Sequence, residues 1–113
     1  HQQNLDLRLD DLLTLNWREQ TLSHQRGQQI PLTEKEFGLL ELFAGTPDGY
    51  LDRDNAFQVL YGYDLQPANR SVDVLVSKLR TKLVSLDPGY RIKPVRGKGY
   101  LLFRASDQDI SPV

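Results

Sequence analysis

The sequence predicts one α+β domain in which short antiparallel strands come first, three helices follow, and a β-hairpin comes last. Three observations support this prediction. Leucines alternate with polar residues near the N-terminus, apolar residues recur at helical spacing in the middle of the chain, and two strand-like stretches near the end flank a glycine-containing turn. The length of 113 residues is enough for one domain with a modest core.

The N-terminal part of the chain shows the period of two that is typical of half-buried strands. The candidate strands are 5–9, 13–16, 21–24 and 28–32, with turns over 17–20 and 26–27. We therefore expect a small antiparallel meander here. We interpret Trp17 as a packing residue. We interpret His24 as a surface strand residue and not as a metal ligand, because no second histidine or cysteine lies near it.

A capping box predicts the start of the first helix. The hydroxyl of Thr33 can accept a hydrogen bond from the backbone N–H of Glu36, whose carboxylate can reach back to the cap. Apolar residues then recur at helical spacing, and a G-T-P-D-G stretch ends a helix over about 34–44. Asp52 is a candidate cap for a second, shorter helix that extends to about Tyr61. A loop over 62–68 follows it.

The stretch 69–86 predicts the longest helix. One side carries an apolar stripe formed by Val72, Val76, Leu79, Leu83 and Leu86. The other side carries hydroxyls and cations, namely Ser77, Lys78, Thr81, Lys82 and Ser85. Asn69 or Ser71 can cap the start, and the D-P-G stretch at 87–89 ends the helix. Asp73 in the first turn suits the positive end of the helix dipole, and we expect no catalytic role for it.

Two more strands are expected over 90–94 and 99–104. Between them, the V-R-G-K-G stretch at 95–99 combines two cations with two glycines at a hairpin tip. Three helices followed by a β-hairpin form a winged-helix arrangement. In such an arrangement the third helix would enter a DNA major groove, and the hairpin, or wing, would reach an adjacent minor groove or the backbone.

The charge distribution points to a polyanionic partner. The net charge of the chain is −1, but residues 1–69 carry 5 basic and 11 acidic side chains. Residues 70–104 carry 9 basic and 2 acidic side chains, a net charge of +7. One third of the chain is therefore strongly basic, which is the pattern expected of a domain that binds nucleic acid on one face.

Several other classes of protein find no support in the sequence. There are no cysteines, no paired histidines, no phosphate-binding glycine loop and no nucleophile–base pair, so we expect no enzyme, no metal and no cofactor. No apolar run approaches the length of a membrane span, and no signal-peptide pattern is present. We interpret 5–104 as the domain, 1–4 as an extension that is disordered or was added for expression, and 105–113 as a polar tail.

Three stretches together resemble a known family, the C-terminal effector domains of OmpR/PhoB-type response regulators. They are L-T-E-K-E-F-G-L-L at 32–40, R-S-V-D-V-L-V-S-K-L-R-T-K-L at 70–83 and V-R-G-K-G-Y at 95–100. The resemblance covers about 5–104 and implies a winged helix with an N-terminal four-stranded antiparallel sheet. It also implies a bacterial, cytoplasmic transcription factor whose separate receiver domain is phosphorylated by a sensor kinase.

The resemblance implies further partners. Effector domains of this family bind tandem direct repeats in double-stranded DNA, often as head-to-tail dimers. The loop at 62–68 resembles the family's transactivation loop, which can contact RNA polymerase. Two alternatives stay open at this point. The chain can be a protein-interaction winged helix with an incidental basic face, or the cytoplasmic DNA-binding domain of a membrane-anchored regulator.

The resemblance also implies the DNA-binding residues. The exposed face of the third helix would read bases through Val74, Leu75, Ser77 and Lys78. Phosphate contacts are implied for Arg70, Ser71, Arg80 and Lys82, although an ion pair within the domain is an alternative for Arg80 and solvation an alternative for Arg70. At the wing, Arg96 would enter a narrow minor groove and Lys98 would add a cation. Leucine at 75 and proline at 94 depart from the polar residue and the threonine that are usual in the family.

Overall fold

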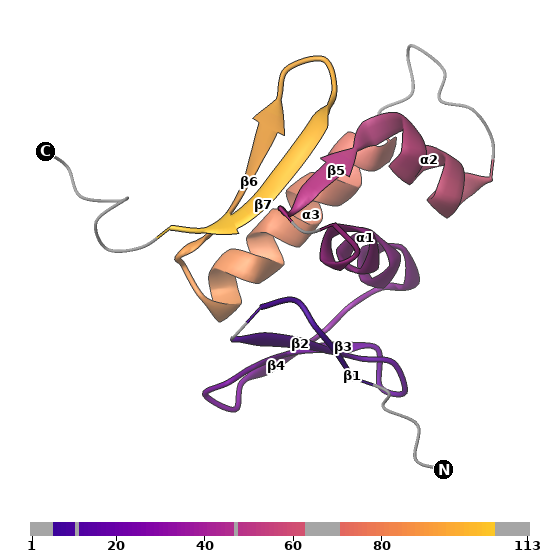
Figure 1. Cartoon of the computed structure of the whole chain (residues 1–113). Coiled ribbons are helices and arrows are strands. Elements are labelled where there is room, and N and C mark those ends of the chain that lie inside the picture. The colour runs from indigo at the N-terminus through magenta and orange to yellow at the C-terminus, as the bar shows by residue number, and fades with distance from the viewer. Residues whose placement is uncertain (1–5, 11, 47, 63–70, 106–113) are drawn as a thin grey trace, which may run out of the picture.

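The computed structural model describes residues 6–10, 12–46, 48–62 and 71–105. Its elements, in chain order, are β1 (Asp6–Arg8), β2 (Leu13–Asn16), β3 (Thr21–His24), β4 (Gln29–Pro31), α1 (Glu34–Ala44), β5 (Tyr50–Asp52), α2 (Arg53–Tyr61), α3 (Ser71–Leu86), β6 (Tyr90–Val95) and β7 (Gly99–Arg104). A four-stranded sheet lies at one end of the molecule, α1 and α3 cross its middle, and the C-terminal hairpin lies beyond them (Figure 1). The predicted α+β winged helix is confirmed.

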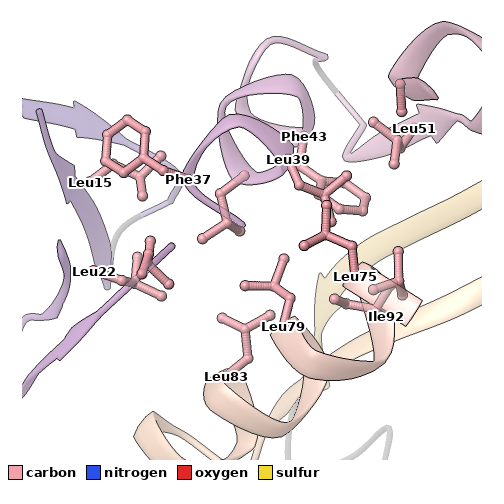
Figure 2. Packing of buried hydrophobic residues seen from close by; sticks show 14 of the residues in the cluster. Leu15, Leu22, Phe37, Leu39, Phe43, Leu51, Leu75, Leu79, Leu83 and Ile92 are labelled. Atoms are coloured by element: carbon pink, nitrogen blue, oxygen red, sulfur yellow. The ribbon is translucent and has the colours of Figure 1, made fainter. Parts of the chain in front are cut away.

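The N-terminal sheet has the strand order β1-β2-β3-β4, and all of its pairs are antiparallel. Leu15 lies opposite Leu22 in the register, and both side chains are fully buried. Figure 2 shows these two leucines facing Phe37 of α1 and Leu83 of α3. The meander expected from the leucine alternation is therefore confirmed, and its apolar face covers the helices.

The predicted caps of the first two helices are present. The Thr33 hydroxyl accepts a hydrogen bond from the Glu36 N–H at 3.2 Å, and the Glu36 carboxylate accepts one from the Thr33 N–H at 2.8 Å. The Asp52 carboxylate caps α2 by accepting a hydrogen bond from the Asn55 N–H at 3.0 Å. Gly62, whose φ of 83° is left-handed, is the C-cap of the second helix. Local sequence therefore determines where α1 and α2 begin.

One strand was not predicted. β5 pairs with β7, so the C-terminal hairpin becomes a three-stranded sheet in the order β5-β7-β6. Three residues are too few to show an alternating pattern, so the sequence gives no sign of this strand. Gly99 makes the pairing possible, because a Cβ at this position would lie 1.8 Å from the carbonyl oxygen of Leu51. The wing is thus joined to the segment that precedes α2.

The third helix buries the predicted apolar stripe, whose members Val72, Val76, Leu79, Leu83 and Leu86 are all at most 3% exposed. Leu75 is buried as well, at 7% exposure, so its expected place on the exposed face is wrong. The physical reason is its spacing. Leu75 lies three residues after Val72 and four before Leu79, which places it at the edge of the same stripe. The expected start of the helix at 69–70 lies outside the described residues.

The expectation for His24 was also wrong, because its side chain is buried. Its Nε2 lies 2.9 Å from Asp87 Oδ2, and its Nδ1 accepts a hydrogen bond from the Arg26 N–H at 3.1 Å. The Asp87 carboxylate also accepts hydrogen bonds from the Gly89 N–H and from Arg104 Nε. The histidine therefore fastens the N-terminal sheet to the turn after α3, a partner 63 residues away in the chain.

Burial and hydrogen bonding act in opposite directions on Asp87. Burial alone would raise the pKa of this carboxyl group. Hydrogen bonds from the Gly89 N–H, His24 and Arg104 outweigh burial and hold the pKa below its usual value. Asp87 is therefore ionised at neutral pH.

Trp17 packs as expected, but only through one side. Its ring meets the Phe37 ring edge-on at a centroid distance of 5.2 Å, while 54% of the residue stays exposed.

Candidate nucleic-acid interface

The outward face of α3 is open to solvent over its N-terminal half. Val74 is 52% exposed, and Ser77 and Lys78 are exposed as well. Lys78 lies four residues after Val74, so the two side chains are neighbours on one face of the helix. No acidic side chain interrupts this face between Val74 and Leu86. The face therefore presents a methyl-bearing surface beside a hydroxyl and a cation, all able to contact an external ligand.

A groove of about 420 Å³ runs beside this face, between α3, the start of α1 and the end of α2. Leu75 lines it together with Val74 and Lys78. On the opposite side, Lys35 Nζ donates to the Leu60 carbonyl oxygen at 2.5 Å. Leu75 thus contributes to the wall beside the exposed face, although it does not belong to that face.

The wing presents two cations at its tip. Arg96 and Lys98 are exposed, and neither side chain makes a hydrogen bond or ion pair in the part of the chain that the structure describes. The tip closes through a hydrogen bond from the Lys98 N–H to the Val95 carbonyl oxygen at 2.9 Å. Gly97 has a φ of 72°, a conformation that favours glycine. The tip therefore presents both cations to solvent.

Lys82 is engaged within the domain. Its Nζ lies 2.6 Å from the Glu36 carboxylate and donates to the Pro31 carbonyl oxygen at 3.1 Å. Burial would raise the pKa of Glu36, but the hydrogen bonds from Lys82 and Thr33 outweigh burial and lower it. The carboxylate is only 2% exposed, so it needs this cation. The sequence placed Lys82 on the outer face and did not indicate this partner.

Arg80 is also held from within. Its Nε and Nη2 donate to the Ile92 carbonyl oxygen at 3.2 and 2.7 Å. Arg80 is therefore engaged within the domain, as the ion-pair alternative implied, but its acceptor is a backbone carbonyl oxygen of β6 and not a carboxylate. Arg80 fixes α3 against the hairpin.

The remaining candidates divide into two groups. Ser71 is the first residue of α3 and is partly buried. Arg70 and the loop over 62–68 lie outside the described residues, apart from Gly62.

The described residues contain no group of three or more potential metal ligands. None of their helices combines the length and the apolar character that crossing a membrane requires.

A three-helix unit whose long third helix leaves one face open beside a cationic β-hairpin is a winged-helix domain. Comparison with known families identifies the particular one. Residues 27–102 match the family described as "Transcriptional regulatory protein, C terminal". The chain belongs to this family, the OmpR/PhoB-type effector domains.

Curated relatives share the same region. The transcriptional regulatory protein GltR of Pseudomonas aeruginosa is 39% identical over 98 residues, which are 82% of this chain and 40% of that protein. The transcriptional regulatory protein CpxR of Escherichia coli is 38% identical over 97 residues, which are 85% of this chain and 41% of that protein. The chain therefore spans about two fifths of the length of these relatives.

Two solved structures support the same assignment. The DNA-binding domain of CpxR from E. coli has a TM-score of 0.71 and 34% identity, with 91% of this chain and all of that chain covered. The DNA-binding domain of RstA from Klebsiella pneumoniae, in complex with the RstA box, has a TM-score of 0.72 and 33% identity, with 90% of this chain and 98% of that chain covered.

Proposed function

We propose that this chain binds double-stranded DNA with sequence specificity, as the effector domain of a response regulator that controls transcription. The observation that carries the proposal is the presence of exposed cations both on the open face of α3 and at the tip of the wing. These are Lys78, Arg96 and Lys98, none of which has an ion-pair partner among the described residues. The structure of the related RstA domain in complex with the RstA box supports the proposal.

In this proposal, α3 lies in the major groove. Lys78 reaches the acceptor atoms of a guanine, Val74 contacts a thymine methyl group, and Ser77 is within reach of either type of base. Leu75 has no part in base recognition, because it is buried. Ser71 and Arg70, at or just before the positive end of the helix dipole, contact phosphate.

The wing makes the second contact. Arg96 enters the minor groove, where a narrow A·T-rich segment concentrates negative potential. Lys98 contacts the adjacent phosphates. Pro94 has no backbone N–H, so the protein has no backbone hydrogen-bond donor for the DNA phosphates at this position. Arg80 and Lys82 are left out of the interface because both already hold α3 in place.

The wider role follows from the family. We infer that the domain works with a receiver domain of the same protein, a cognate sensor kinase and RNA polymerase, the last through 62–68. We also infer head-to-tail pairing on tandem direct repeats, a bacterial cytoplasmic setting, and no catalytic activity. The boundaries of the domain are proposed at 5 and 104.

Selection of bound DNA from a random duplex pool at moderate salt tests the proposal. We expect enrichment of two direct half-sites about one helical turn apart, roughly 10 base pairs. Binding should weaken steeply as salt rises, because neutralised phosphates release counterions.

Retention without enrichment would reduce the function to nonspecific binding. A complete lack of retention would favour a protein-interaction winged helix, which pull-downs with RNA polymerase would then examine.

A further inference from the structure

Three residues from three elements meet between α3 and the wing, and none of them belongs to the proposed DNA contacts. Arg53 is the first residue of α2, Asp73 lies in the first turn of α3, and Tyr100 is the second residue of β7. Arg53 Nε and Nη2 donate to the two carboxylate oxygens of Asp73 at 3.1 and 2.6 Å. The Tyr100 hydroxyl donates to Asp73 Oδ1. We call these three residues the wing clamp.

The wing clamp is continuous with the backbone of the wing. The Arg53 N–H donates to the Lys98 carbonyl oxygen at 3.0 Å. Next to it, Gly99 lies so close to β5 that a Cβ at this position would be 1.8 Å from the Leu51 carbonyl oxygen. A hollow of about 260 Å³ separates the clamp from the tip and is lined by both. The start of α3 and the tip of the wing are therefore joined through one short path of hydrogen bonds.

The clamp has the properties of a rigid spacer. A bidentate arginine–carboxylate pair has a fixed planar geometry, and partial burial strengthens it relative to a surface pair. Burial and the hydrogen bond to Asp73 raise the pKa of Tyr100 to about 12. The hydrogen bond to Asp73 also raises the pKa of Arg53. The donors therefore keep their protons throughout the physiological pH range.

We propose that Arg53, Asp73 and Tyr100 are positioning residues that set the distance and orientation between α3 and the wing. This inference rests on the proposed function, because it concerns how two DNA contacts are combined. A wing held at the correct distance meets the minor groove without a further ordering cost once α3 has entered the major groove. A loosened wing forfeits that advantage, although α3 itself stays anchored by its apolar stripe.

A double-mutant cycle tests the inference, with DNA affinity as the measurement and a duplex selected by the unmodified domain as the probe. Tyr100→Phe removes one hydroxyl and keeps the ring. On a duplex with A·T-rich flanks, we expect Arg96→Ala to weaken binding about fivefold in the unmodified domain and only about twofold in the Tyr100→Phe background, a coupling factor of about 2.5. Lys78→Ala should weaken binding by the same factor in both backgrounds, because Lys78 lies on α3.

A matched control is Tyr50→Phe, which removes a hydroxyl from the other face of the same sheet, one register position from the partner of Tyr100. Its cycle with Arg96→Ala should be additive. Asp73→Asn provides a second variant, and thermal unfolding confirms that each variant is folded under the binding conditions.

The outcomes separate the two proposals. Equal factors for Arg96→Ala in the unmodified, Tyr100→Phe and Asp73→Asn backgrounds would overturn the clamp's positioning role while leaving DNA binding intact. A domain that prefers no duplex in any form would overturn the proposed function, and the clamp's role with it. If the clamp were merely structural, its variants would lower affinity and stability, but they would not reduce the effect of Arg96→Ala specifically.

Discussion

The two halves of α3 use similar residues for different purposes. The N-terminal half, up to Lys78, has an open outer face, and its cation is not engaged by the described residues. In the C-terminal half, Arg80 is held by β6 and Lys82 by the buried Glu36 carboxylate. A basic residue on a helix in a DNA-binding domain is thus no guide to its partner. What decides its role is whether another element of the fold offers an acceptor within reach.

The largest expected effect comes from removing the cation of Lys82, in the C-terminal half of α3. Lys82→Met leaves the Glu36 carboxylate buried without its ammonium partner, so we expect the free energy of unfolding to fall by about 2 kcal/mol. Affinity for the selected duplex should change less than about twofold, since Lys82 is outside the proposed interface. Urea unfolding and DNA titration measure the two quantities.

Lys78→Met is the matched control for this experiment. It removes the same charge from an exposed position and should change the free energy of unfolding by less than about 0.5 kcal/mol. Unchanged stability together with a large loss of affinity in Lys82→Met would restore Lys82 as a phosphate contact.

The stabilisation that Asp87 provides just after α3 should depend on pH in the acid range. The pKa of Asp87 is depressed in the folded state, so its stabilisation is complete above the unfolded value of about 3.9 and is lost as pH falls through the lower, folded value. We expect Asp87→Asn to cost about 1.5 kcal/mol at neutral pH. Below about pH 4 the difference from the unmodified domain should shrink. Urea unfolding over a pH series measures it, and a difference that stays constant throughout the acid range would contradict the assignment.

In the N-terminal half of α3, Lys78→Ala tests the proposed contact with a base. We expect affinity for the selected duplex to fall about tenfold, because a lysine contact to guanine acceptors is lost. Affinity for unrelated duplex should fall much less, since only one of several cations is removed. Competition titrations give both values, and equal losses on both duplexes would exclude a base-reading role.

The smallest expected effect belongs to the wing. Arg96→Ala should weaken binding about fivefold on half-sites with A·T-rich flanks and hardly at all on G·C-rich flanks, where the minor groove is wider. Titration of two duplexes that differ only in the flanks measures this difference. Identical losses on both would place the wing on the backbone and not in the minor groove.

Most of the elements could be predicted because their signals are local. The capping box at Thr33 and the cap at Asp52 each involve residues three apart, and the alternation of leucines spans only a few positions. The open face with Val74 and Lys78 also follows from helical spacing. Leu75 was within reach too, because its spacing from Val72 and Leu79 places it at the stripe's edge.

The rest depended on residues that are distant in the chain. The three-residue strand β5 forms because Gly99 has no Cβ and the backbone of Leu51 can therefore pack against it. His24 is buried because it has a hydrogen-bond partner in Asp87, 63 residues later in the chain. The sequence by itself determined the helices, the strands of the meander and the hairpin, since short-range hydrogen bonding and apolar periodicity specify them. Only the tertiary structure decided which cations of α3 stay available for DNA, because that depends on which buried oxygen atoms the folded chain brings beside each one.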